Sequence, residues 1–151
     1  MKKILGITLL AMAAMSSGTS HAATNVTGNF DVKITLTSQC SLTLPAASKD
    51  VVFTYTSFQA AQANSTGGDF SVACTKSLPY TINIDQATVT DAAVDLQYIL
   101  TMPAVNNTGT GATQNFNVSG KILGGQGGTC NAATCDNAAS ANKTRTLTIG
   151  F

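Results

Sequence analysis

The chain has 151 residues, of which 10% are charged, and its formal net charge is +1. All seven acidic residues are Asp, and there is no Trp. This length fits one domain, and the balanced charge offers neither the basic surface of a nucleic-acid-binding module nor an acidic tail. A composition of 44% hydrophobic residues, with many Thr and Val and few charges, favours β-strands. This composition is not typical of a coiled coil or of an integral membrane protein.

Residues 1–22 have the layout of a secretory signal peptide. A basic start is followed by the apolar run Ile4–Met15 and then by small, polar residues. The apolar run has 12 residues, fewer than the roughly 20 that a membrane-spanning helix needs. Ser20 and Ala22 occupy the small-residue positions, so we expect cleavage after Ala22. An uncleaved anchor helix is the alternative.

Removal of residues 1–22 leaves 151 − 22 = 129 residues with no His and no Glu. Because His is the usual general base near neutral pH, Ser–His and Cys–His nucleophile pairs are excluded. Asp91 and Asp95 form the only close acidic pair, and we expect them in a solvated loop. The lack of these catalytic residue types therefore predicts that the protein is not an enzyme and needs no cofactor.

Four cysteines remain in the exported part: Cys40, Cys74, Cys130 and Cys135. An even number in an exported protein indicates disulfides, although four cysteines allow three pairings. Cys130 and Cys135 enclose a short loop of small residues that closes easily, which leaves Cys40 with Cys74. A zinc site is the alternative, but the absence of His and the oxidising compartment speak against it.

Hydrophobic alternation of period two predicts most of the elements. From Val26 to Leu36, apolar residues and Gly28 alternate with polar ones, which is typical of a strand with one buried face. A possible helical turn or loop at 58–64 is ended by Gly67 and Gly68, residues 106–112 are rich in turn formers, and 124–142 is a long loop. The predicted strands cover 28–36, 40–44, 51–56, 69–75, 79–85, 96–102, 115–123 and 143–151. Short strands separated by turn signals predict an all-β sandwich.

Both ends of the mature chain are predicted to be amphipathic strands, although chain ends are usually frayed and polar. Either both strands have partners outside the domain, or they pair with each other within one closed sandwich. The pattern alone leaves both possibilities open.

Three stretches resemble the spore coat U domain family, which holds the subunits of archaic chaperone–usher pili. They are residues 26–34 leading to Cys40, residues 67–74 followed by 80–85, and the C-terminal residues 146–151. Their order, the placement of Cys40 and Cys74, and the terminal Phe are specific in combination. The loop closed by Cys130 and Cys135 departs from the pattern of the major subunits.

The resemblance implies an incomplete immunoglobulin-like sandwich that is completed by donor-strand addition. A periplasmic chaperone lends a strand to an exposed groove, and at the outer-membrane usher the N-terminal extension of the next subunit replaces it. Residues 23–36 would be this extension and 37–151 the pilin domain. The implied site residues are Val26, Gly28, Phe30, Val32 and Ile34 in the donor strand, and Leu147, Ile149 and Phe151 for the chaperone.

The leading hypothesis is a structural subunit of a surface pilus, exported through the periplasm and supporting adhesion and biofilm formation. Its partners would be the chaperone, the usher and neighbouring subunits in a homo- or hetero-polymer. The alternative is a secreted or coat-associated monomeric β-sandwich that binds a ligand.

Overall fold

The computed structural model describes residues 25–103 and 105–151, so the predicted signal peptide and residues 23–24 of the extension lie outside the described residues. The described chain divides into a unit that ends at Thr35 and a unit from Leu36 to Phe151. No helix among the described residues is both long and apolar enough to cross a membrane.

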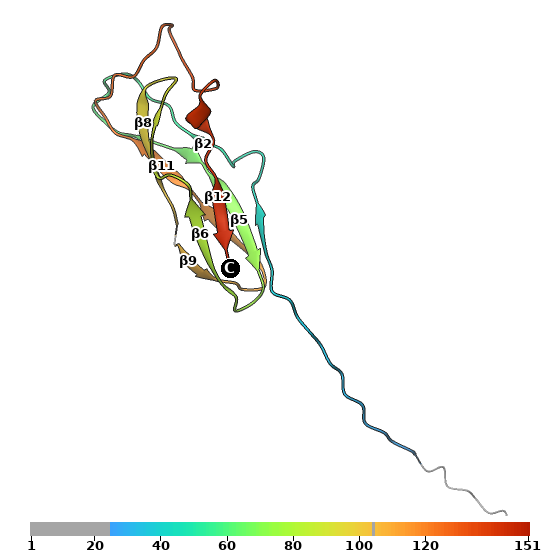
Figure 1. Cartoon of the computed structure of the whole chain (residues 1–151). Coiled ribbons are helices and arrows are strands. Elements are labelled where there is room, and N and C mark those ends of the chain that lie inside the picture. Colours follow the sequence, from blue (N-terminus) through green and yellow to red (C-terminus); the bar gives the residue numbers. More distant parts are fainter. Residues whose placement is uncertain (1–24, 104) are drawn as a thin grey trace, which may run out of the picture. The chain divides into compact units, whose positions relative to one another are not determined.

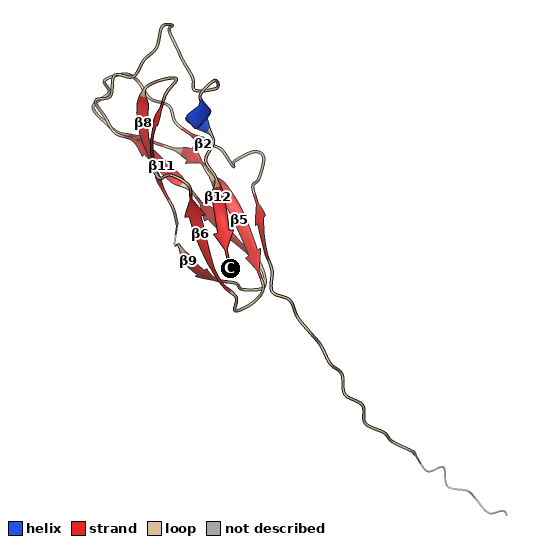
Figure 2. Ribbon diagram, viewed as in Figure 1, coloured by secondary structure: helices blue, strands red, loops and turns tan. Residues whose placement is uncertain are grey.

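Twelve short strands and one turn of 3-10 helix, η1 (Ala141–Lys143), make up the described chain (Figures 1 and 2). The prediction of an all-β sandwich is confirmed. The strands are β1 (Cys40–Thr43), β2 (Val51–Val52), β3 (Ala63–Asn64), β4 (Thr66–Gly67), β5 (Asp69–Cys74), β6 (Pro79–Ile84), β7 (Thr88–Asp91), β8 (Leu96–Thr101), β9 (Asn106–Thr108), β10 (Thr113–Asn117), β11 (Ser119–Ile122) and β12 (Leu147–Gly150).

The strands pair antiparallel in four small sheets, in the orders β1-β5-β10, β3-β11-β8-β7, β12-β6-β9 and β2-β4. Inward side chains from several of these sheets form a single apolar core, in which Val72 and Ile82 are fully buried. The core also holds Ala63, Phe70, Cys74, Tyr80, Val89, Tyr98, Leu100, Val118 and Ile122. One shared core is what makes the sheets a sandwich.

Both predicted disulfides are present, Cys40–Cys74 and Cys130–Cys135. The first joins β1 to β5 at positions that are paired across the ladder. Cys74 is buried in the core, whereas the loop from Cys130 to Cys135 is exposed. The Cys40–Cys74 bridge therefore restrains the edge of a sheet, and the Cys130–Cys135 bridge restrains a surface loop.

Several predicted elements differ from the structure. Residues 25–36 form no strand, because a strand needs a hydrogen-bonded neighbour and no described strand pairs with them. Of the two possibilities for 58–64, the loop holds for residues 58–62, which β3 follows, and β9 lies within the turn-rich stretch at 106–112. The predicted strand 115–123 is divided into β10 and β11, and the last predicted strand begins later, at Leu147.

The expectation that Asp91 lies in a solvated loop is wrong. Asp91 ends β7 and is only 2% exposed, because hydrogen bonds satisfy its carboxylate inside the protein. Asp95, the other member of the pair, is exposed in the following turn with φ of 47°.

Candidate functional site

A groove of about 1040 Å³ in the domain has a lining of apolar core residues and of polar residues. One wall is the stretch that contains β2, where Val51, Phe53 and Tyr55 turn inward and alternate with exposed residues. The lining also contains Ile84 of β6 and Leu147 of β12, which are paired in register. Core residues from the strands between them form the rest of the lining: Phe70, Leu96, Tyr98, Leu100, Val118 and Ile122.

The strand β12 borders this groove and is an edge strand. It pairs with β6 on one side, and no described strand pairs with its other edge (Figure 1). The strand β1 is likewise at the edge of its own sheet, with β5 as its partner. Unpaired backbone groups on an edge strand are a template for a further strand. The groove therefore combines an apolar interior with free main-chain hydrogen-bonding groups.

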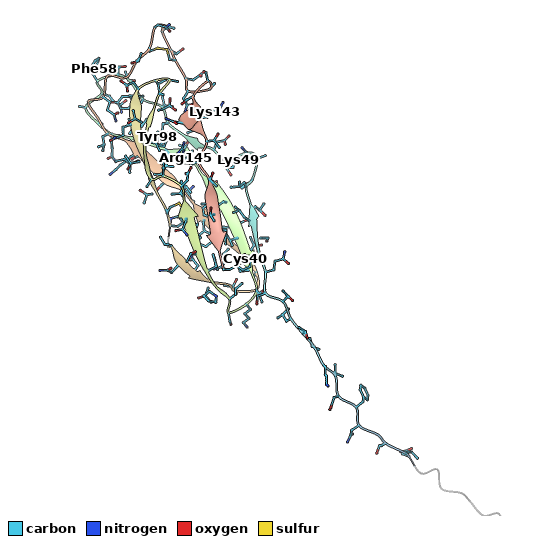
Figure 3. The ribbon with its side chains drawn as sticks, viewed as in Figure 1. Cys40, Lys49, Phe58, Tyr98, Lys143 and Arg145 are labelled. Atoms are coloured by element: carbon cyan, nitrogen blue, oxygen red, sulfur yellow. A yellow bond between two sulfur atoms is a disulfide. The ribbon has the colours of Figure 1, made fainter. Side chains whose placement is uncertain are left out.

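A strap formed by residues 135–146 supplies much of the polar lining, including Asp136, Asn137, Lys143 and Arg145. It precedes β12, and Lys143 and Arg145 lie in the half of the domain away from Cys40 (Figure 3). The polar part of the groove is thus remote from the Cys40–Cys74 bridge.

The buried carboxylate of Asp91 holds the strap in place. It accepts hydrogen bonds from Asn137 Nδ2 at 3.0 Å and from the backbone N–H of Ala93 at 2.9 Å. Burial raises the pKa of this carboxyl, but these bonds, together with those of Ser140 and Val94, lower the pKa below its usual value. Asp91 is therefore ionised at neutral pH and acts as a structural anchor.

Arg145 and Tyr98 fix the other end of the strap. Both donate to the carbonyl oxygen of Asn142, Arg145 Nη2 at 2.9 Å and Tyr98 Oη at 3.1 Å. Arg145 Nη1 also donates to Gln86 Oε1 and lies 3.5 Å from Asp85 Oδ2. Within the described residues, the Nε–H of Arg145 is buried and has no acceptor. One donor beside the groove is therefore free.

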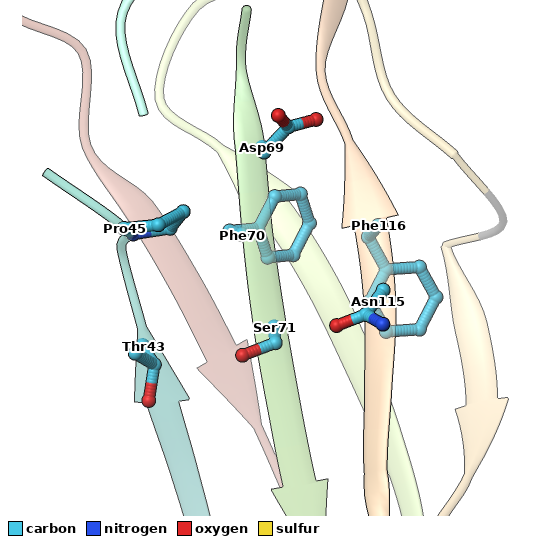
Figure 4. Close-up of a pocket in the computed structure, with 7 residues that line it drawn as sticks. All are labelled: Thr43, Pro45, Asp69, Phe70, Ser71, Asn115 and Phe116. Atoms are coloured by element: carbon cyan, nitrogen blue, oxygen red, sulfur yellow. The ribbon is translucent and has the colours of Figure 1, made fainter. Parts of the chain in front are cut away.

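A second, smaller hollow of about 340 Å³ lies against the sheet β1-β5-β10 (Figure 4). Phe70 and Phe116 stack there with ring centroids 5.4 Å apart. Its one acid is Asp69, whose pKa is lowered by hydrogen bonds from Asn117 and Ser48, with burial opposing them. No base, thiol or second carboxylate accompanies Asp69 in this lining. Among the described residues, no three potential metal ligands come together.

The sequence-predicted site residues fall into two separate groups. Leu147 and Ile149 are half-buried against the core, and Phe151 is 64% exposed at the C-terminus. Val26, Phe30, Val32 and Ile34 are 72–96% exposed. A Cβ at Gly28 would meet no atom within 4 Å, so nothing within the described chain requires a glycine there.

The wall formed by Val51, Phe53 and Tyr55 was predicted as a strand but not as a site. The strap and the anchor Asp91 were not predicted as parts of a site at all. Only the alternation at 51–55 could have indicated a role, because the strap is a polar loop without periodicity.

A comparison with protein families gives a match that covers the exposed segment from Val26 and many of the residues that line the groove. The family model described as the Spore Coat Protein U domain matches residues 26–101, half of the chain. The chain belongs to the spore coat protein U domain family. This family has its known context in chaperone–usher pili, and its members are structural subunits rather than known enzymes.

The family match includes the exposed segment from Val26 and ends with β8, so the strap and β12 lie beyond it. The resemblance stated from the sequence is therefore confirmed at the level of the family. No curated protein and no solved structure gives a significant match to the chain.

Proposed function

We propose that the mature chain is a structural subunit of a surface pilus, assembled through the chaperone–usher pathway by donor-strand complementation. One observation carries this proposal: among the described residues, the chain holds both a groove bordered by an unpaired strand edge and an apolar segment without a strand partner. Residues 23–36 would serve as the donor strand and 37–151 as the accepting domain. The signal peptide at 1–22 would direct the chain to the periplasm.

The length and the alternating apolar side chains of the proposed donor segment support this proposal. From Val26 to Leu36, the 11 residues would extend about 36 Å as a strand at about 3.3 Å per residue. Burial of Val26, Phe30, Val32 and Ile34 would contribute roughly 1.5–3 kcal/mol each, before the cost of ordering the segment. Gly28 in the same row would fill a shallow part of the groove, where backbone approaches closely.

Main-chain bonding would come from the free edge of β12, as in other strand additions. The unpartnered Nε–H of Arg145, next to this strand, would gain an acceptor if a carbonyl oxygen of the incoming strand lay beside it. A buried donor without an acceptor costs free energy, so strand addition would relieve this cost as well.

Before assembly, a periplasmic chaperone would occupy the groove and recognise Leu147, Ile149 and Phe151. The exposed Phe151 offers an apolar side chain that an apolar pocket of the chaperone would bind. At the outer-membrane usher, the segment of the next copy would replace the chaperone. The resulting pilus would support adhesion and biofilm formation at the cell surface.

The proposal is tested by deletion of residues 24–36 from the exported chain. The truncated subunit should still be purified with its chaperone, because its groove is intact, but fibres of it should be absent by electron microscopy. A chain that is soluble and monomeric without any chaperone would instead support the alternative of a monomeric binding module.

A further inference from the structure

Phe58 is the most exposed aromatic residue of the domain from Leu36 to Phe151, at 76%. It also has a φ of 61°, in the left-handed region that bulky side chains rarely adopt. Strain of this kind persists only where the surrounding structure enforces it, and it is common at binding sites. A folded domain gains nothing from holding an exposed aromatic ring in a strained backbone.

The surroundings of Phe58 enforce its position. Its N–H donates to the carbonyl oxygen of Gln126 at 2.8 Å, and the N–H of Gly125 donates to the carbonyl oxygen of Gln59 at 2.7 Å. The ring lies against Gly127, where an added Cβ would come to 3.0 Å from the ring edge, so a larger residue at position 127 would push the ring aside. The loop is therefore built to present this ring rigidly to the outside.

The ring is presented at the end of the domain opposite Cys40 (Figure 3). Leu123, which accepts a hydrogen bond from Gln126, adds a second exposed apolar side chain next to this loop. We call Phe58 and Leu123 the apolar tip.

The short linker to Cys40 determines which surface of a neighbouring copy meets this tip. Only Thr37, Ser38 and Gln39 separate the donor segment from β1, so they span about 10 Å at about 3.3 Å per residue. The Cys40 end of a donating copy must therefore lie next to the end of the groove from which its strand leaves.

That strand would leave the accepting groove at the end remote from Cys40. If the incoming strand left at the Cys40 end of the accepting copy, it would compete for space with the donor segment that starts there. Every junction between copies would then be crowded. A continuing head-to-tail chain of copies needs different surfaces at its two ends. The apolar tip of one copy thus faces the Cys40 end of the next.

We propose that the apolar tip docks onto the Cys40 end of the next copy in the fibre, an inference that rests on the proposed function. The docking surface consists of the loops 75–78 and 109–112. These loops are joined by hydrogen bonds from Ser77 N–H to Gly109 O and from Gly109 N–H to Leu78 O, both 2.7 Å. The N–H of Thr75 donates to Gln39 O, so the surface lies beside the linker.

A photo-crosslinking amino acid in place of Phe58, in the full-length chain assembled into fibres, tests this contact. We expect crosslinks from position 58 to peptides containing residues 75–78 or 109–112 of another copy. Crosslinks that reach only other surfaces, or only proteins other than this chain, would overturn the proposal.

Two substitutions at the same position separate the contact from strand exchange. Phe58→Asn should leave fibre formation intact, because Asn tolerates a positive φ, but the fibres should break several-fold faster under shear. Phe58→Leu keeps an apolar side chain and should retain most of the resistance to shear. If Phe58→Asn fibres break at the same rate as those of the natural chain but no longer attach to an apolar surface, the apolar tip serves adhesion. That result would contradict docking. Failure of strand exchange is different, since it abolishes the fibres altogether.

Discussion

The exposed segment from Val26 to Leu36 and the C-terminal strand β12 have the same alternating pattern and opposite environments. In β12, Leu147 and Ile149 turn toward the core and the backbone pairs with β6. In the segment, the alternating apolar side chains are exposed and the backbone has no strand partner in the described chain. The pattern alone therefore does not decide whether a stretch of chain is a strand of its own domain.

The difference lies in the partner that each stretch has available. β12 extends an existing sheet by one strand, and its own outer edge is left open. The segment would need such an open edge, and β12 offers one to another copy. An alternating sequence thus allows a segment to add to a sheet as a strand. The unpaired edge strands of the fold determine where the segment can add.

The most severe change to the segment is Phe30→Asp. An unpaired carboxylate in an apolar groove costs several kcal/mol, so fibre formation should be lost while the chaperone complex persists. Fibre yield by electron microscopy and chaperone co-purification measure the two effects. Asn29→Asp, which adds the same charge on the polar side of the segment, is the matched control and should assemble. Loss of the chaperone complex with Phe30→Asp would mean that the segment belongs to its own domain.

On the side of β12, Phe151→Asp should strongly weaken capture by the chaperone. Because Phe151 is mostly exposed, this change removes a recognition element without disturbing the core. The quantity to measure is the amount of subunit that is purified with tagged chaperone. Thr148→Asp, on the exposed face of the same strand, should have little effect. Equal recovery of both variants would show that the C-terminal residues only pack within the subunit.

The two disulfides allow the stability of two regions to be compared. Cys40–Cys74 lies next to the exposed segment, and Cys130–Cys135 lies in the loop before β12. Replacement of both Cys40 and Cys74 by Ser opens a link across 34 positions, and the loop-entropy relation gives about 4 kcal/mol of lost stability. Replacement of Cys130 and Cys135 opens a link across 5 positions, with about 2 kcal/mol lost. Urea unfolding of chaperone-bound subunits checks this ranking. A larger loss for the second pair would show that the strap matters more than the β1–β5 edge.

The smallest expected effect is a pH dependence at the anchor of the strap. Since the pKa of Asp91 is lowered in the folded protein, its stabilisation is complete above the ordinary value of about 3.9 and is lost as pH falls through the folded pKa. Asp91→Asn should reduce the free energy of unfolding by about 1–3 kcal/mol at neutral pH. The difference from the natural chain should shrink below about pH 4. A difference that stays constant down to pH 2 would exclude a role of the ionised carboxylate.

Much of the fold was predictable because alternation and burial coincide in its longer strands. The strands β5, β6 and β8 lie within one residue of their predicted ends, and both disulfides follow from export and spacing. The strand β7 was missed because it is short and carries Asp91, whose burial depends on Asn137 far along the chain. A sequence does not reveal such distant hydrogen bonds.

The candidate site was predictable only in part, for a similar reason. The segment and β12 are visible as periodic apolar patterns. The strap and the apolar tip depend on backbone contacts, such as the one between Phe58 and Gln126, that leave no periodic signal in the sequence.

The account depends most on the claim that the segment of one copy fills the groove of another. Fibres assembled from an equal mixture of isotope-labelled and unlabelled full-length chains, with a photo-crosslinking residue in place of Phe30, test it directly. The account predicts crosslinks from position 30 to groove peptides containing Val51–Tyr55 or Leu147, with half of the crosslinked pairs joining a labelled chain to an unlabelled one. Crosslinks to the same groove that never join labelled to unlabelled chains would show that each chain fills its own groove, and would contradict the account.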